Sequence, residues 1–432
     1  MKIIESNDFE AYWKNIPQGI SDKSLVSAVE DIISAVRSDG DTAIRGFASR
    51  FDKSSPEKLE ISSEVVRAAY EDMLKKEPAL VSALKLSAEH IKRFADRQRS
   101  QFADFEYEIE PGIFTGQRVI PVQRAAVYVP GGRFPLISSV LMGIIPALSA
   151  GVEEVILASP PAEDGLPDKR ILAAAYMSAP KGLRVFAMGG AQAVAALAIG
   201  TETVPRADVI AGPGNKYVAM AKRLLFGEIG IDLIAGPTDV LIIADESSDP
   251  SFIAADMLAQ AEHDPDARSR VLVSNKELAE RISVCLKERL TVLDTAETAQ
   301  SSLLAGGLIV IYKNREDAVK IANTIAPEHL ELHLKDSEAW LPALKNYGSV
   351  FIGKEAAEVL GDYSAGINHT LPTSSSARFT GGLSVRHFLK TLTTLRCQSG
   401  KAYNAALEAA ECIARAEGLS AHAESAAIRL RD

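Results

Sequence analysis

Apolar residues recur at helical spacing through the first hundred residues of the chain. In 27–37 and 62–98 they return every third or fourth position, which brings their side chains to one face of a helix. A similar pattern, rich in alanine and glutamate, returns over 402–431. We therefore predict helical segments at both ends of the chain.

From about Gln123 the pattern changes to short apolar runs, each followed by a turn with glycine or proline and, in most cases, by an amphipathic segment. The expected strands are 125–129, 154–158, 184–188, 208–211, 239–244, 270–274, 308–312 and 349–352. Strands that alternate with helices favour parallel sheets in an α/β fold. The strands come in two successive groups, so we predict two such sheets.

Length and charge narrow the class of protein. At 432 residues the chain is too long for one ordinary core, so two or more domains are expected. Its 47 basic and 57 acidic residues argue against a nucleic-acid partner. No apolar run approaches the roughly 20 residues that cross a bilayer. The N-terminal segment lacks a secretory pattern, so we expect a cytoplasmic protein with no membrane partner. Three scattered cysteines are too few for a disulfide framework.

Two polar clusters have the composition of a reactive site. Gln260 and His263 lie three positions apart at the end of an apolar helix, so they can address one metal ion, although the pair taken alone favours a polar helix cap. Glu328 and His329 begin an extended segment and suit acid–base catalysis, because histidine titrates near neutrality and a carboxylate can activate water. The alternative is an exposed pair at a strand edge. We interpret His333 as structural.

Two further clusters lie nearer the C-terminus. The glycines, the proline and the polar residues of segment 361–372 predict a loop. Its Asp362 and His369 have side chains that can bind a metal ion or a substrate. The hydroxyl-rich stretch after it is interpreted as a turn. Glu417 and His422 flank a helix break and, taken alone, predict only that break.

Three glycine-containing turns, 129–132, 188–192 and 211–215, follow predicted strands and precede helical segments. Backbone N–H groups at such helix starts can bind a phosphate. None of the turns has the G-x-G-x-x-G pattern with a later acidic residue, so a dinucleotide is allowed but not required.

Eight motifs, in order over nearly the whole chain after about residue 25, resemble the histidinol dehydrogenase family. They are YVPGG, GGAQAVAAL, AGPGN, AGPTDVLIIAD, QAEHDP, APEHLEL, GDYSAGINHTLPT and EGLSAH. The resemblance implies NAD as cofactor, with contacts from Tyr128, Gln192 and Asn215. It also implies one zinc ion per subunit, and the matching ligands are Gln260, His263, Asp362 and His422. In the family the last histidine comes from the partner subunit, which implies an intertwined homodimer.

The implied chemistry is two successive oxidations, from alcohol to aldehyde and from aldehyde to acid. His329 takes the hydroxyl proton as hydride leaves, and Glu328 then activates water on the aldehyde. Zinc is expected chiefly to orient the amino alcohol. The implied substrate contacts are Thr238, Gln260, His263, His329, Asp362, His369, Glu417 and His422.

The expected fold comprises two Rossmann-like parallel-sheet domains with helical extensions at both ends. We expect an N-terminal helical extension in 1–24 and a discontinuous first domain in 25–127 plus 239–375. A second domain in 128–238 carries the NAD-binding turns, and a helical tail in 376–432 contacts the partner subunit.

Departures from the family pattern leave the substrate open. Thr238-Asp239 stands where histidinol enzymes more usually have Ser-Glu, and GINHT differs from the commoner GPNHV. These variants resemble a side branch that oxidises sulfopropanediol, whose sulfonate Arg133 or Arg378 could bind. His369 and Glu417 suit the cationic histidinol instead. A non-catalytic zinc protein is a further alternative, but it is expected to lack the Glu-His pair.

Overall fold

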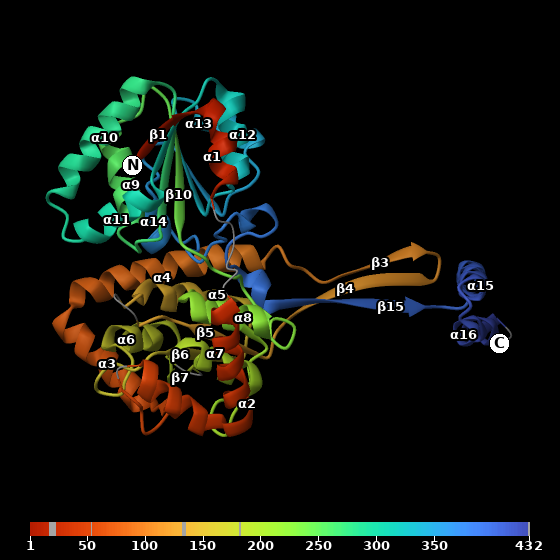
Figure 1. The fold of residues 1–432 in the computed structure, drawn as a ribbon. Coiled ribbons are helices and arrows are strands. Elements are labelled where there is room, and N and C mark those ends of the chain that lie inside the picture. The colour runs from red at the N-terminus through yellow and green to blue at the C-terminus, as the bar shows by residue number, and fades with distance from the viewer. Residues whose placement is uncertain (17–22, 53, 132–134, 181–182, 431–432) are drawn as a thin grey trace.

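The structure, a computed structural model, describes residues 1–16, 23–52, 54–131, 135–180 and 183–430. Two α/β units lie one above the other, and a long arm projects from their junction (Figure 1). Within the described residues, no helix is both long and apolar enough to cross a membrane.

The first unit contains a six-stranded sheet in the order β2-β7-β6-β5-β8-β9, parallel except for the pair β2 and β7. Its strands are β2 (Glu60–Ile61), β5 (Arg124–Tyr128), β6 (Glu154–Ser159), β7 (Leu183–Ala187), β8 (Val209–Ala211) and β9 (Gly230–Ile231). Its helices are α2 (Lys23–Phe51), α3 (Ser63–Lys76), α4 (Pro78–Arg99), α5 (Ile137–Ala150), α6 (Lys169–Ser178), α7 (Gly190–Ile199) and α8 (Lys216–Leu225).

Helices cover both faces of this sheet, which explains its continuous apolar strands. Successive strand residues point to opposite faces. Ile156 and Ala158 of β6 therefore pack with α2, α7 and α8, whereas Val155 and Leu157 pack with α5 and α6.

The second unit contains a fully parallel sheet in the order β1-β12-β11-β10-β13-β14. Its strands are β1 (Lys2–Glu5), β10 (Asp239–Ala244), β11 (Arg268–Val273), β12 (Leu308–Ile311), β13 (His329–His333) and β14 (Ser349–Ile352). Its helices are η1 (Ser6–Asp8), α1 (Phe9–Lys14), α9 (Pro250–Ala261), α10 (Lys276–Leu290), α11 (Ala296–Gly306), α12 (Arg315–Ile325), α13 (Ser337–Trp340), η2 (Leu341–Ala343) and α14 (Glu358–Tyr363).

Strand β13 is buried on both faces, and the two faces differ in chemistry. Leu330 and Leu332 join the apolar cluster that includes α12. The alternate residues His329, Glu331 and His333 point to the opposite face, where α9 packs on the sheet. One strand thus carries a row of buried ionisable side chains.

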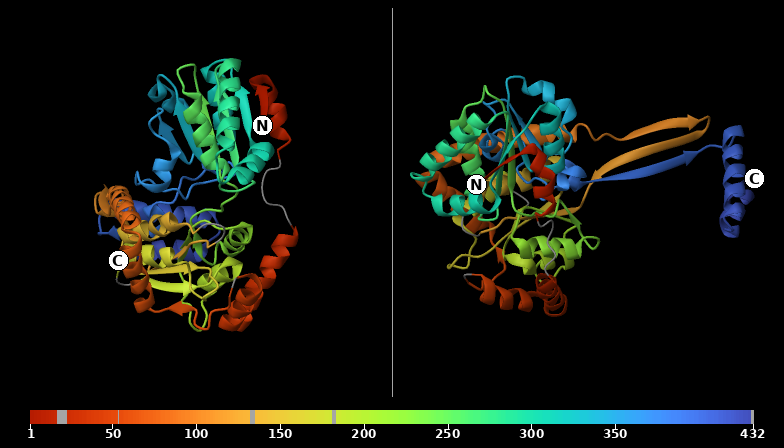
Figure 2. Two further views of the ribbon diagram at one scale, coloured as in Figure 1. Left: turned by 90° about the vertical axis from the view of Figure 1, so that its left-hand side faces the viewer. Right: turned by 45° about the horizontal axis from the view of Figure 1, so that its top comes forward.

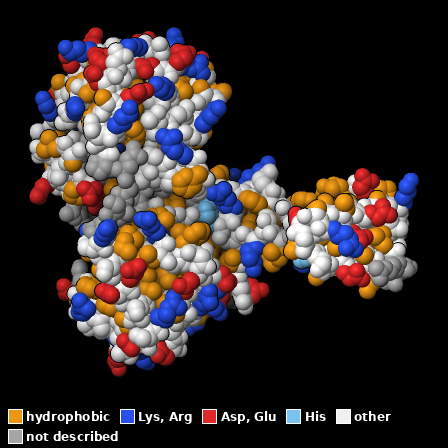
Figure 3. Space-filling model, turned by 45° about the vertical axis from the view of Figure 1, so that its right-hand side comes forward, with side chains coloured by type: hydrophobic (Ala, Val, Ile, Leu, Met, Phe, Trp, Pro, Cys, Tyr) orange, Lys and Arg blue, Asp and Glu red, His pale blue; other side chains and the backbone are white. Residues whose placement is uncertain are grey.

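The arm is an antiparallel sheet in the order β15-β4-β3 with two helices at its tip (Figures 1 and 2). Its elements are β3 (Phe105–Glu110), β4 (Ile113–Pro121), β15 (Leu389–Cys397), α15 (Lys401–Ala416) and α16 (Ser420–Leu430). The short helices η3 (Ser376–Arg378) and η4 (Val385–Phe388) precede β15, and Val385 and Phe388 of η4 join the core of the first unit. Apolar side chains are exposed along it, including Phe105, Tyr107 and Leu395 on the strands and Ile413 on α15. Figure 3 shows such side chains on the projecting part of the molecule.

The predicted α/β fold and its strands are confirmed. All the expected strands are present within two residues of their predicted bounds, the first four in one sheet and the last four in the other.

The packing differs from the predicted domain boundaries. Residues 25–127 were expected to join 239–375, yet α2, α3 and α4 pack on α7, α6 and α5 of the first unit. The segment 1–24, predicted as helical, contributes β1 to the second sheet, and the tail 376–432 contains β15. Helical periodicity shows that a helix has an apolar face, but it does not show which sheet that face covers.

Candidate active site

The predicted Glu-His pair lies at the amino end of β13, beside the start of β10. Glu328 Oε2 accepts hydrogen bonds from the Thr238 hydroxyl at 2.5 Å and from the Asp239 N–H at 3.1 Å. Burial raises the pKa of Glu328 to about 7. A carboxyl group with a pKa near neutrality suits a general base, because it is both available and basic.

Asp239 fixes the backbone of this pair. Its Oδ1 accepts the Glu328 N–H at 3.1 Å, and its Oδ2 lies 3.1 Å from the Arg270 guanidinium in a buried ion pair. The guanidinium in turn lies over the Trp13 ring, 5.3 Å from its centroid. The aspartate that departs from the usual family pattern therefore positions Glu328.

His329 is surrounded by carboxyl groups. Its Nδ1 lies 3.5 Å from Glu358 Oε1, and its Nε2 lies 3.6 Å from Asp362 Oδ1. Among the described residues neither buried ring nitrogen has a hydrogen-bond partner. Burial alone lowers the pKa of His329, but Glu358, Glu328 and Asp362 together raise it well above its ordinary value. The surrounding carboxyl groups therefore stabilise the protonated form of the ring.

Gln260, in the last turn of α9, is buried and faces the same group of side chains. Its carboxamide lies between Thr238 and Glu358. In the orientation that satisfies both ends, its nitrogen donates to Glu358 Oε1, and its oxygen accepts from the Thr238 hydroxyl and from the Asp239 N–H at 3.2 Å. Burial raises the pKa of Glu358 well above its usual range. The buried network thus runs from Glu358 through Gln260 and Thr238 to Glu328.

Asp362 on α14 joins the same group. Burial alone raises the pKa of its carboxyl group, but His329, His369 and His263 lower it below the usual value. His369 bridges the two units, since its Nε2 lies 3.0 Å from the Ser139 hydroxyl of α5 and its Nδ1 lies 3.1 Å from the Asp362 carbonyl oxygen. His263 is exposed, two residues beyond the end of α9.

Two predicted residues lie elsewhere in this chain. Glu417 ends α15, His422 lies on α16, and both are exposed at the tip of the arm, away from the second sheet (Figure 1). Three of the four predicted zinc ligands border one group of side chains: Gln260 contacts Glu358, Asp362 lies 3.6 Å from His329, and His263 lowers the pKa of Asp362. The fourth does not.

The predicted cofactor residues lie at turns of the first unit. The Tyr128 hydroxyl accepts from the Gly190 N–H at 3.1 Å, and burial raises the pKa of Tyr128 to about 12. Gln192 donates to Asp52 at 3.4 Å, and burial raises the pKa of Asp52 to about 6. Asn215 caps α8 by accepting from two backbone N–H groups. Part of the predicted turn 129–132 lies outside the described residues.

A buried ion pair holds the third of these turns. Lys222 pairs with Asp232 and donates to the Gly212 carbonyl oxygen at 2.8 Å, while Asp232 Oδ2 accepts the Gly212 N–H at 2.7 Å. Gly212 has φ of 116°, and a Cβ there would lie 2.0 Å from the Tyr128 carbonyl oxygen. The turn therefore requires glycine and is fixed by a charge pair.

We expect Asp232→Asn to lower the free energy of unfolding by about 3–5 kcal/mol, because it leaves the Lys222 ammonium buried without its counter-charge. Chemical denaturation measures this loss. Glu163→Gln, at an exposed acid, is the control and should change stability by no more than about 0.5 kcal/mol. An equal effect of both variants would contradict the role given to the pair.

Sequence reasoning missed several residues of this site. Glu358 and Ser139 lie in none of the quoted motifs, and the fold brings Glu358 to His329 and Ser139 to His369. Asp239 lies in the motif AGPTDVLIIAD, but its contact with the Glu328 backbone was not predicted. For the alternative anionic substrate, Arg378 is already occupied by the Thr324 carbonyl oxygen, and Arg133 lies outside the described residues.

The fold consists of two α/β units, each with a mainly parallel sheet. In the second unit a buried Glu-His pair lies beside further nitrogen and oxygen donors. This arrangement is that of an α/β enzyme that uses acid–base chemistry. The family model described as histidinol dehydrogenase matches residues 17–430. The chain belongs to the histidinol dehydrogenase family, whose members are NAD-linked oxidoreductases.

Relatives match over nearly their whole length. The chain is 43% identical to the histidinol dehydrogenase of Aquifex aeolicus, covering 96% of this chain and 94% of the relative. It is 45% identical to that of Thermus thermophilus, covering 95% of this chain and 96% of the relative. The crystal structure of histidinol dehydrogenase from Elizabethkingia anophelis superimposes with a TM-score of 0.92 at 32% identity, covering 100% of this chain and 97% of that one.

Proposed function

We propose that this chain is a zinc-dependent histidinol dehydrogenase, which oxidises L-histidinol through its aldehyde to L-histidine with two NAD. The observation that carries the proposal is the buried Glu328–His329 pair beside the Gln260 and Asp362 side chains. The relatives named histidinol dehydrogenase support the same substrate.

The residues fit a zinc ion. Gln260, His263 and Asp362 offer only nitrogen and oxygen donors, which zinc accepts. The Asp362 carboxylate lies 3.6 Å from the His329 ring, and the buried Gln260 carboxamide contacts Glu358, which lies 3.5 Å from the same ring. When bound, zinc would orient the amino group and imidazole of the substrate.

The catalytic pair moves the protons. His329 accepts the proton of the substrate hydroxyl while hydride passes to NAD, and neighbouring carboxyl groups stabilise the resulting imidazolium. Glu328 then takes a proton from the water that attacks the aldehyde, and His329 assists the second hydride transfer. NAD is assigned to the turns of Tyr128, Gln192 and Asn215.

The fourth zinc ligand requires a second subunit. His422 is carried on an arm that projects away from the two α/β units of its own chain (Figure 2). The arm exposes apolar side chains on its strands and helices. In a homodimer that exchanges arms, each site receives its last ligand and Glu417 from the partner. The cytoplasmic location expected from the sequence stays a prediction.

The substrate test supplies purified protein with zinc, NAD and one alcohol at a time, and follows absorbance of NADH. We expect NADH with L-histidinol and little with sulfopropanediol. Turnover of sulfopropanediol without turnover of histidinol would reject the proposed substrate. Zinc binding without turnover of either alcohol would favour an assembly role.

We expect His422→Ala to lower zinc content, because one of four protein ligands is lost. Metal analysis after gel filtration measures this change. Glu408→Gln, at an exposed residue of the adjacent helix α15, is the control and should retain zinc. Unchanged zinc in His422→Ala would mean that the ligand assignment is wrong.

Mixing variants tests the exchange of arms. Glu328→Gln and His422→Ala subunits are each expected to have little activity alone. A mixed dimer has one intact site if His422 acts in the partner, so random mixing should restore about a quarter of wild-type activity. If mixed dimers are shown to form and no activity is recovered, zinc ligation by His422 across the interface would be contradicted.

A further inference from the structure

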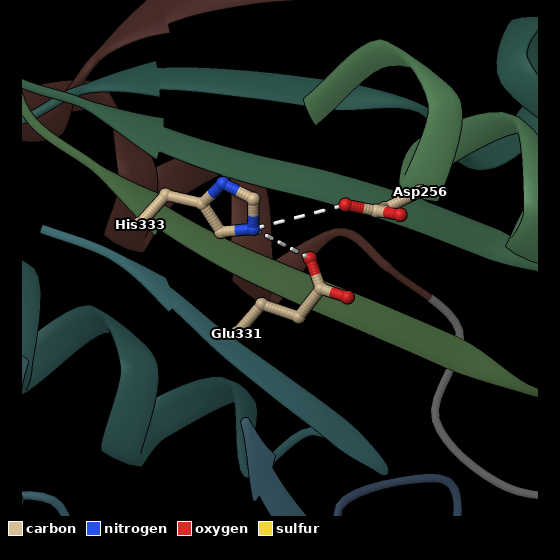
Figure 4. A group of neighbouring side chains, drawn as sticks. All are labelled: Asp256, Glu331 and His333. Atoms are coloured by element: carbon tan, nitrogen blue, oxygen red, sulfur yellow. Dashed lines mark hydrogen bonds and ion pairs between the residues drawn. The ribbon is translucent and has the colours of Figure 1, made fainter. Parts of the chain in front are cut away.

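A second group of ionisable side chains is buried further along the same elements. Glu331 and His333 follow His329 on one face of β13, and Asp256 lies one helical turn before Gln260 on α9. Figure 4 shows the Asp256 and Glu331 carboxylates converging on one ring nitrogen of His333. Neither the proposed chemistry nor the predicted zinc site uses these residues.

The spacing of the donor atoms suits a metal ion. His333 Nε2 lies 3.2 Å from Glu331 Oε2 and 3.7 Å from Asp256 Oδ2. The ligand atoms of the three residues all lie within 4.8 Å of one another. Donors about 2.1 Å from a tetrahedral zinc ion lie about 3.4 Å apart, so little movement is needed to bind one.

The group is built into the core. The side chains of Glu331 and His333 are 0% and 1% exposed, and that of Asp256 is 12% exposed. Glu331 Oε1 accepts the Glu358 N–H at 3.0 Å, which leaves Oε2 facing His333. His333 Nδ1 has no hydrogen-bond partner among the described residues, so no contact there fixes which ring nitrogen holds the proton.

Charge also favours a cation. Two buried carboxylates face one imidazole. Arg289 also acts on the charge of Asp256, but its guanidinium donates its hydrogen bond to the Ser251 hydroxyl, at 2.5 Å, and not to the carboxylates. Burial and the neighbouring Glu331 raise the pKa of Asp256 to about 7. A divalent cation would compensate the charge of both carboxylates.

We propose that Asp256, Glu331 and His333 bind a second divalent cation of the zinc class. Their one nitrogen and two oxygen donors suit zinc, with water completing the coordination. The cation would tie α9 to β13 and so hold Gln260 and His329, which lie on the same two elements, in register. This site is independent of the proposed substrate.

The test is the zinc content of the full-length protein after equilibration with zinc and gel filtration. Wild type is expected to retain two zinc ions per chain. The double variant His263→Ala, His422→Ala removes both imidazoles of the first site, and its substitutions are at exposed positions that leave the second group untouched. It is expected to retain one zinc. Adding Asp256→Asn should remove that ion, whereas adding the exposed Asp266→Asn should not.

Crystals of wild type grown with zinc locate the ion by anomalous scattering at the zinc absorption edge. A peak between Asp256, Glu331 and His333 is expected. The proposal is overturned by no peak there, or by a double variant that retains no zinc. A third result is possible: wild type binds one zinc ion, the double variant keeps it, and the further change Asp256→Asn removes it. That result supports this second site and contradicts the first one.

Discussion

Glu328→Gln is expected to slow oxidation of the aldehyde by about 10²- to 10⁴-fold and to slow oxidation of the alcohol far less. The amide keeps the shape of the carboxyl group and its contact with Thr238, but it cannot take a proton from water. Supplying the alcohol and the aldehyde separately, and following NADH in single-turnover experiments, resolves the two steps.

The pH dependence of the same step provides an internal check. The deprotonated form of Glu328 is the active one and its pKa is about 7, so the aldehyde step in wild type should accelerate as pH rises through 7. This rise should disappear in Glu328→Gln. Glu338→Gln, at an exposed acid of α13, is the control and should behave as wild type. Equal losses on alcohol and aldehyde would argue against Glu328 as the water-activating base.

His329→Asn is expected to slow both oxidations by about 10²- to 10⁴-fold, because one imidazole serves as the proton acceptor in each. Asparagine fills part of the same buried space but cannot be protonated there. Steady-state rates with the alcohol and with the aldehyde measure the two effects.

Zinc content distinguishes this role from metal binding. The ligand atoms of His329, Glu358 and Asp362 lie within 4.8 Å of one another, which is also a spacing that holds a metal ion. If His329 is the base, the asparagine variant loses activity and keeps its zinc. Loss of zinc together with activity would make His329 a ligand and would remove the proton acceptor from the proposed chemistry.

The fold could be predicted where hydrophobic pattern alone decides it. Strands such as β6 and β10 are buried on both faces, so their apolar runs stand out between turns. The arm was not predicted. All six residues of β3 are exposed in this chain, although Phe105, Tyr107 and Ile109 alternate with glutamates in the pattern of a strand with one apolar face. The two-residue strands β2 and β9 are too short to show a period.

The site could be predicted in part because its motifs contain rare combinations of reactive residues. Glu328, His329, Gln260 and Asp362 were all expected, and the fold brings them together. Glu358 and Asp256 were not expected, since an isolated acid on a helix is usually solvated and only packing buries it. His333 was interpreted as structural because it lies beyond the tight cluster around Glu328 and His329.

The ratio of NADH formed to L-histidinol consumed tests the central claim most directly. With purified protein, zinc and excess NAD, the account predicts two NADH and one L-histidine for every histidinol oxidised, and loss of both products after zinc is removed by a chelator. A ratio of one with accumulation of the aldehyde, or no NADH from histidinol in zinc-loaded protein, would contradict it.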